Sequence, residues 1–207
     1  REEELARRTE IDTAGLSKGQ RKVLELVLEG KSVFFTGCAG TGKSHVLGCV
    51  VRALQRQRRQ VQVTAPTAMA ACALGGVTLH SFSGVGQGNR PIEEMRKRLT
   101  RAARLRWRSI DVLIVDEVSM VSARLLEQVD AAAKEARAST RPFGGVQVVF
   151  CGDFFQLPPV SRGGFDTAES RMCFESQRWD EAIQEYVILK TVFRQTDPSF
   201  VRALNDL

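Results

Sequence analysis

The chain has 207 residues, 43% of them hydrophobic, which is enough for one globular α/β domain with a buried core. Its 30 lysines and arginines exceed its 24 aspartates and glutamates, and the formal net charge of +6 favours a polyanionic partner. No segment approaches the ~18 consecutive apolar residues that cross a bilayer, so we expect no membrane partner.

The start of the chain is charged and has no apolar centre, which excludes a secretory signal. We expect residues 1–15 to be a charged lead-in and residues 16–207 to form a single domain. Because the sequence does not begin with Met, we also expect it to be part of a longer protein.

The cysteines are odd in number, widely spaced and free of any CxxC pattern, which indicates reduced thiols in an intracellular protein. His45 and His80 are too isolated to build a metal site. The five cysteines are Cys38, Cys49, Cys72, Cys151 and Cys173.

The first half of the chain alternates strand and helix patterns. Ser17 is a suitable N-cap for a helix whose apolar residues face one side, and Gly30 ends that helix. The next elements predicted in chain order are a strand at 32–36, a helix at 43–56, a strand at 61–65 and a short helix at 67–74. This order indicates a βαβ unit.

The second half continues the alternation. We expect a basic helix over residues 91–108, and its arginines either attract a polyanion or form a solvated helix face. A second group of arginines, within residues 52–59, has the same two interpretations. The elements expected next are a strand at 112–115, a helix at 122–137, a strand at 146–151 and a strand at 186–189.

Strands separated by helices predict a mainly parallel sheet with helices on both faces, because a parallel connection needs a dozen or more residues. Ligands of such sheets bind at the carboxyl ends of the strands.

A GxxxxGKS motif follows the first strand and opens the next helix, as a phosphate-binding loop does. Small residues let successive backbone N–H groups curl around phosphates, and the helix presents its positive end to the anion. Lys43 would reach the β and γ phosphates, and Ser44 would offer a hydroxyl to Mg²⁺. The predicted ATP-binding residues of this loop are Gly37, Cys38, Ala39, Gly40, Thr41, Gly42, Lys43 and Ser44.

An acidic pair follows the buried strand at 112–115 and looks like a Walker B motif. We expect Asp116 to hold Mg²⁺ through a water, and Glu117 to orient and deprotonate the water that attacks the γ phosphorus. The alternative is a strand whose two final carboxylates open a solvated loop. Together with the phosphate loop, the pair predicts ATP and Mg²⁺ as cofactors.

Several further segments carry a family resemblance. Residues 152–160, GDFFQLPPV, resemble motif III of superfamily-one helicases. Residues 79–82, 141–147 and 192–195 are similar to the PIF (petite integration frequency) family of 5′-to-3′ DNA helicases, and residues 125–145 resemble that family's signature stretch. The resemblance runs from about residue 16 to the last residue.

This resemblance implies a RecA-like P-loop NTPase domain, the first of two motor domains of a DNA helicase that acts in the nucleus and/or mitochondrion. Its partners would be single-stranded DNA and a second RecA-like domain of the same parent protein, which we expect to be missing from these 207 residues. We therefore expect the chain to bind ATP but to hydrolyse it poorly alone. The sequence indicates no oligomeric state.

The resemblance also implies individual roles. Gln20 would read the adenine edge, because an amide can donate and accept together. Gln156 would sense the γ phosphate and couple it to DNA, and Arg194 would contact the same phosphate. With Lys43 and the acidic pair, these last two residues complete the expected catalytic set of Lys43, Asp116, Glu117, Gln156 and Arg194.

Residues 64–71 resemble motif Ia and residues 78–82 resemble motif Ib, which implies contact with single-stranded DNA. An aromatic side chain there can stack on a base, which contributes about 1–3 kcal/mol. The packing of His80 and Phe82 inside the domain is the alternative. The predicted DNA-binding residues are Pro66, Thr67, Ala68, His80, Ser81 and Phe82.

Two residues depart from the family pattern. Ala68 stands where the family usually has glycine, so a close phosphate contact at its N–H would be weakened or shifted. Cys38 replaces a more usual serine, and we expect little loss there because the loop binds through its backbone.

Two other functions remain possible on these residues. A RecD-like recombination helicase subunit shares motifs I, II and III, but residues 79–82 and 142–145 favour the PIF family. A nucleotide-gated binding module without translocation is the other, and Gln156 and the basic surface favour a motor over it.

Overall fold

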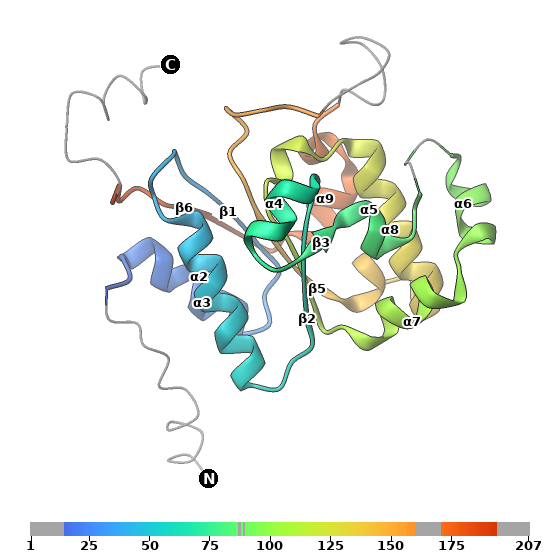
Figure 1. Cartoon of the computed structure of the whole chain (residues 1–207), viewed down its shortest axis with the longest axis horizontal. Coiled ribbons are helices and arrows are strands. Elements are labelled where there is room, and N and C mark those ends of the chain that lie inside the picture. The colour runs from blue at the N-terminus through green and yellow to red at the C-terminus, as the bar shows by residue number, and fades with distance from the viewer. Residues whose placement is uncertain (1–14, 87, 89, 160–170, 194–207) are drawn as a thin grey trace.

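The centre of the fold is a six-stranded sheet in which every pair of neighbouring strands is parallel. The computed structural model describes residues 15–86, 88, 90–159 and 171–193 (Figure 1). The strand order β3-β2-β4-β5-β1-β6 confirms the predicted α/β class. The strands are β1 Val33–Thr36, β2 Val61–Ala65, β3 Val77–Thr78, β4 Val112–Val115, β5 Gln147–Cys151 and β6 Glu185–Ile188.

Helices cover both faces of this sheet, as the sequence predicts (Figure 1). Leu113 belongs to a core that also contains Trp107 and Phe150, whereas its neighbour Ile114 belongs to a second core around Phe35. The side chains of successive strand residues therefore pack on opposite faces of the sheet, because a strand is pleated. The α-helices are α2 Lys18–Leu28, α3 Lys43–Arg56, α4 Ala68–Ala73, α5 Leu79–Ser83, α6 Ile92–Arg98, α7 Arg101–Ser109, α8 Ala123–Arg137 and α9 Gln177–Ala182.

Among the described residues, three short 3-10 turns join these elements: η1 Val118–Met120, η2 Pro142–Gly145 and η3 Cys173–Glu175. Within the part of the chain that the structure describes, no helix is both long and apolar enough to cross a membrane.

The basic segment 91–108 forms two helices rather than the single helix that the sequence predicts. Leu99 leaves the helical conformation, with φ −63° and ψ 114°, and is buried in the core. Thr100 then starts α7, and its hydroxyl accepts a hydrogen bond from Ala103 N. The break lets Leu99 reach the core and turns α7 so that it packs against α8.

Three arginines of α7 join this helix to its neighbours. Arg104 pairs with Glu135 of α8 at 2.9 Å. Arg106 donates to Phe82 O and Arg108 donates to Ala136 O. These side chains therefore join α7 to α5 and α8, so neither a solvated face nor a free polyanion surface describes them.

A buried aspartate of α8 holds the η2 turn. Phe143 has φ 48° although it is not glycine, and its buried ring packs on Phe150. Asp130 Oδ1 accepts from Phe143 N at 2.8 Å, and Asp130 Oδ2 lies 2.7 Å from Lys134 Nζ. Arg137 Nε adds a bond to Gly144 O. The strained turn is thus fixed at three points, which positions the start of β5.

We predict that Asp130→Ala lowers the free energy of unfolding by about 2–4 kcal/mol, because it leaves the Phe143 N–H and the Lys134 ammonium buried without their partner. Asp130→Asn keeps an acceptor for Phe143 N and should cost less. Urea denaturation followed by circular dichroism measures both variants. A loss below about 0.5 kcal/mol for the alanine variant, which is typical of surface changes, would contradict this role.

Candidate functional site

The loop between β1 and α3 forms a preshaped curl at the carboxyl edge of the sheet. Gly40 and Gly42 have φ 85° and 79°, which favours glycine. A Cβ added at Gly37 would lie 2.7 Å from Thr41 Oγ1 and 2.8 Å from Leu189 O. Thr41 Oγ1 also donates to Cys38 O at 2.9 Å. The loop thus has room only for hydrogen at Gly37, and one hydroxyl braces its curl.

Lys43 lies across this curl. Its Nζ donates to Gly37 O at 2.6 Å and reaches Cys38 O at 3.5 Å. The Ser44 side chain is exposed beside it, in the first turn of α3. The loop therefore brings residues 37–44 together, and places an ammonium and a hydroxyl where an anion would enter.

Gln20 of α2 supports the phosphate loop through a hydrogen bond. Its Nε2 donates to Thr41 O at 3.0 Å, and its Oε1 accepts from Ser17 N at 2.9 Å, completing a capping box at the start of α2. Both ends of the buried amide are therefore occupied within the protein. Recognition of an adenine edge by Gln20 stays a prediction, because it requires the amide to exchange one of these partners.

The chain after β6 returns to the phosphate loop. Phe193 N donates to Gly40 O at 2.9 Å, and the Phe193 ring is half exposed beside Gly42. The motif IV resemblance at 192–195 is a sequence signal for this approach. Arg194, the next residue, lies outside the described residues.

The acidic pair stands at the end of β4, at the same edge. Asp116 is only 7% exposed, and burial raises the pKa of its carboxyl. The Glu117 N–H, the Cys151 thiol and the Lys43 ammonium each counteract part of that rise. Burial of a carboxylate is costly even with a lysine nearby, and perturbed groups of this kind gather at functional sites.

Glu117 has a strained backbone, with φ 51° and ψ 44°. Burial, followed by the charge of Asp116, raises the pKa of its carboxyl, and the charge of Asp153 adds to the rise. Left-handed backbone at a residue other than glycine is costly and is concentrated at functional sites. Glu117 is therefore a carboxylate with increased basicity, held beside the buried aspartate.

Residues 152–156 join this acidic group. Asp153 is buried, its Oδ1 accepts from Phe155 N and its Oδ2 accepts from Gln156 Nε2 at 3.0 Å. The side chain of Gln156 is exposed. The charge of Asp153 also influences the pKa of Glu117. The hydrogen bond from Gln156 to Asp153 therefore places the Gln156 side chain next to the acidic pair.

A divalent cation fits the chemistry of these donors. Asp116 supplies a carboxylate whose burial favours a positive partner, and Ser44 supplies a hydroxyl from the start of α3. Oxygen donors of this kind suit Mg²⁺, which keeps most of its waters.

The segment after β2 reaches the same edge of the sheet. Thr67 Oγ1 accepts from Ala70 N, so this hydroxyl caps α4, and Ala68 is exposed at the start of that helix. Met69 is 86% exposed. The sequence analysis did not include Met69 among the predicted DNA-binding residues, although an apolar residue within motif Ia was a usable signal. Ala68 and Met69 thus form an exposed corner beside the half-buried Pro66.

The predicted DNA-binding residues of α5 divide into two groups. Ser81 is exposed and His80 is half-buried, with burial lowering the pKa of the imidazole. Phe82 is 1% exposed, and its ring packs edge-on against Trp107 at 4.8 Å. The expected stacking of the Phe82 ring on a base is therefore wrong for this structure, because the ring is part of the core. Packing, the alternative role, is the observed one.

Comparison with known families supports this site. A sequence model of the PIF1-like helicase family matches residues 15–205. The ATP-dependent DNA helicase PIF1 of Candida albicans is 46% identical over 202 residues, which span 93% of this chain and 22% of that protein. The human ATP-dependent DNA helicase PIF1 is 41% identical over 91% of this chain and 29% of its own length. The chain thus spans less than a third of either curated relative.

Solved structures show the same similarity. The crystal structure of Pif1 helicase from Candida albicans matches 92% of this chain and 43% of that chain, with a TM-score of 0.86. Pif1 helicase from Bacteroides, solved in complex with ADP-AlF3 and single-stranded DNA, has a TM-score of 0.80 at 32% identity, over 92% of this chain and 46% of that one. The expected RecA-like fold is confirmed by these neighbours. Because the family model covers residues 15–205 and the relatives match nearly the whole chain, this chain belongs to the PIF1-like helicase family.

Proposed function

We propose that this chain is the ATP-binding first motor domain of a 5′-to-3′ DNA helicase. The observation that carries the proposal is the meeting of a preformed phosphate loop with a buried carboxylate, Asp116, whose pKa responds to Lys43. Relatives named ATP-dependent DNA helicases support it, as does the neighbour solved with ADP-AlF3 and single-stranded DNA. Family membership favours this function over a RecD-like subunit.

The loop would bind the nucleotide through its backbone. N–H groups of this loop would bind the phosphates, and Lys43 would move from Gly37 O to the β and γ phosphates. Ser44 and Asp116 would hold Mg²⁺, which neutralises charge on the β and γ phosphate oxygens. Because Lys43 already lies over the loop, nucleotide binding would replace its acceptor Gly37 O with a phosphate oxygen.

Hydrolysis would begin at Glu117. Its carboxylate accepts a proton from a water as the water oxygen forms a bond to the γ phosphorus, and the bond to the bridging β–γ oxygen breaks to leave ADP and phosphate. The raised pKa of Glu117 makes the carboxylate a better base near neutral pH. Gln156 would register the γ phosphate, and Arg194 would stabilise the same charge.

Single-stranded DNA would cross the carboxyl edge above the site. The exposed start of α4 at Ala68 and the exposed Ser81 offer backbone and hydroxyl donors for phosphates. Met69 offers an apolar surface for a base. A second RecA-like domain of the parent protein would complete both sites, so we expect slow hydrolysis by these 207 residues alone. Such a helicase would act on DNA in the nucleus and/or mitochondrion.

The experiment that tests the function is the fluorescence anisotropy of a labelled oligo-dT strand, titrated with this chain at several salt concentrations. We expect binding that weakens steeply with salt, because phosphate contacts release counterions, and that changes when a non-hydrolysable ATP analogue is added. Absence of binding at low salt would contradict the DNA contact and favour a nucleotide-gated module.

A matched pair of variants locates the strand. Ser81→Glu places a carboxylate on the proposed path and should weaken oligo-dT binding by about tenfold, which corresponds to about 1.4 kcal/mol. Gln55→Glu makes the same charge change on the exposed surface of α3 and should leave affinity within about twofold. Equal losses in the two variants would indicate a general charge effect.

We predict that Gly37→Ala abolishes binding of a fluorescent ATP analogue, because the new Cβ would meet Thr41 Oγ1 and Leu189 O. Gly48→Ala in α3 is the control. Its Cβ meets only the flexible end of Arg52, at 3.3 Å. That variant should bind normally and gain about 0.5–1 kcal/mol of stability, since alanine favours a helix interior. Normal binding by Gly37→Ala would exclude the tight curl as the phosphate site.

We predict that Asp116→Asn stabilises the nucleotide-free protein. The folded-state pKa of Asp116 is raised, so its ionisation favours the unfolded chain at every pH above the ordinary carboxyl range. Removal of the charge should raise Tm by at least about 2 °C, whereas nucleotide binding should lose its dependence on Mg²⁺. The control Glu25→Gln, on the exposed side of α2, should shift Tm by less than about 1 °C. A lower Tm for Asp116→Asn would show that the carboxylate is stabilising.

A further inference from the structure

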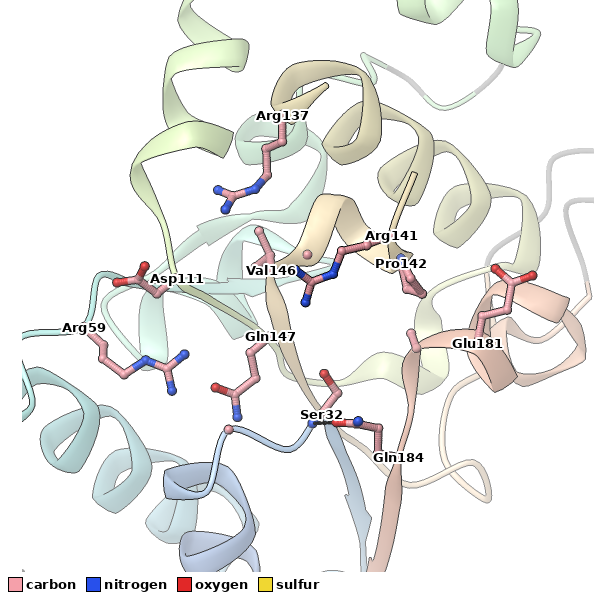
Figure 2. Close-up of a pocket in the computed structure, with 13 residues that line it drawn as sticks. Ser32, Arg59, Asp111, Arg137, Arg141, Pro142, Val146, Gln147, Glu181 and Gln184 are labelled. Carbon is pink, nitrogen blue, oxygen red and sulfur yellow. Dashed lines mark hydrogen bonds between the residues drawn. The ribbon is translucent and has the colours of Figure 1, made fainter. Parts of the chain in front are cut away.

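A polar hollow lies at the amino edge of the sheet, opposite the phosphate loop. Its volume is about 410 Å³. Ser32, Asp111, Gln147 and Gln184 line it, and each stands at or just before the start of a strand (Figure 2). Apart from Gln20 of α2, the candidate nucleotide and DNA residues follow the carboxyl ends of strands. An occupant of this hollow would therefore leave the ATP site free.

Three arginines line the hollow, and only one of them serves the fold. Arg137 donates to Gly144 O at 2.9 Å and to Trp107 O at 2.7 Å. The guanidinium groups of Arg59 and Arg141 make no hydrogen bond or ion pair with any residue that the structure describes. Figure 2 shows these two groups entering the hollow from opposite sides.

The acidic side chains of the hollow already have partners. Asp111 Oδ2 accepts from Gln60 N at 2.8 Å, and Glu181 pairs with Arg178. The two carboxylates are thus engaged while Arg59 and Arg141 are not. The unmatched charge of the hollow is positive.

The site is held rigidly beneath these arginines. Gln147 is 7% exposed, and its Nε2 donates to Val27 O and Lys31 O. Gly145 has φ +83°, and a Cβ there would lie 3.4 Å from the Arg141 guanidinium carbon. The absence of a side chain at Gly145 lets the guanidinium rest close against the η2 turn. Part of the conformational entropy that binding would cost is therefore already lost in the free protein.

We propose that this hollow docks an acidic segment of a protein partner, whose carboxylates pair with Arg59 and Arg141. Guanidinium groups bind carboxylates through two parallel hydrogen bonds, which gives direction as well as attraction. A nucleic acid duplex fits this hollow of about 410 Å³ less well. The hollow admits a few side chains, whereas a duplex needs an extended basic strip.

Docking at this edge would couple the motor to another protein without blocking its chemistry. The hollow is lined by the connections that lead into β1, β4, β5 and β6, and the nucleotide loop leaves β1 at its other end. A partner tethered here would be carried with the domain through nucleotide binding and release.

The test uses a fluorescein-labelled peptide of five Glu-Gly repeats, with the same peptide carrying Gln in place of Glu as its uncharged counterpart. Anisotropy should show that only the acidic peptide binds, and saturation with a non-hydrolysable ATP analogue should not displace it. Arg59→Glu with Arg141→Glu should weaken its binding by about tenfold or more. The control pair Lys97→Glu with Arg101→Glu makes the same charge change on exposed side chains, and its effect should stay within about twofold.

Binding of the fluorescent ATP analogue at unchanged affinity shows that each variant is folded. If the double variant does not fold, amide chemical shifts of the unmodified chain test the proposal instead. The acidic peptide should shift the signals of Gly145, Gln147 and Gln184 and leave those of residues 37–44 unchanged. Equal losses in both double variants would overturn the proposal, as would absence of peptide binding at low salt. Stronger competition by a ten-base-pair DNA duplex than by the unlabelled acidic peptide would assign the hollow to nucleic acid instead.

Discussion

Parallel strand pairing is the constraint on which both sites of this domain depend. Because all six strands run in one direction, every carboxyl end opens onto one edge and every amino end onto the other. The residues that follow these carboxyl ends therefore lie at one edge, although long stretches of chain separate them: Gly37, Pro66, Asp116 and Gly152. The same constraint gathers the connections at the opposite edge into the hollow that Arg59 enters. The sheet thus separates a nucleotide edge from a docking edge.

The electrostatics of the nucleotide edge follow from crowding three carboxyl groups around one lysine. Burial raises the pKa values of Asp116 and Glu117, and the charges of Asp116 and Asp153 raise that of Glu117 further. Lys43 counteracts the rise in both, while its own Nζ is held by a backbone carbonyl. Such an arrangement costs stability in the absence of a cation and nucleotide. Function, and not the fold, accounts for its presence.

The sequence could predict what local chemistry decides. The phosphate loop, the acidic pair and Ser17 as a cap each depend on residues within a few positions of one another, and the structure places all of them as expected. The break at Leu99 could not be read from helical spacing, because the burial of Leu99 against distant elements decides it. Phe82 failed as a base-stacking residue for the same reason, since only the fold reveals that Trp107 covers its ring.

Arginine shows most clearly why composition predicts function poorly. The net charge of +6 favours a polyanionic partner, and the arginines of residues 91–108 are expected either to attract it or to form a solvated helix face. In the structure Arg104, Arg106 and Arg108 are instead bound to groups of neighbouring helices. A guanidinium that is already hydrogen bonded to carbonyl groups keeps its charge but offers fewer donors to a ligand. Arg59 and Arg141 lie outside that run, and their guanidinium groups make no hydrogen bond or ion pair with the part of the chain that the structure describes. Recognition by this domain therefore depends on which guanidinium groups the fold leaves unbound, and the number of arginines in a segment does not determine that.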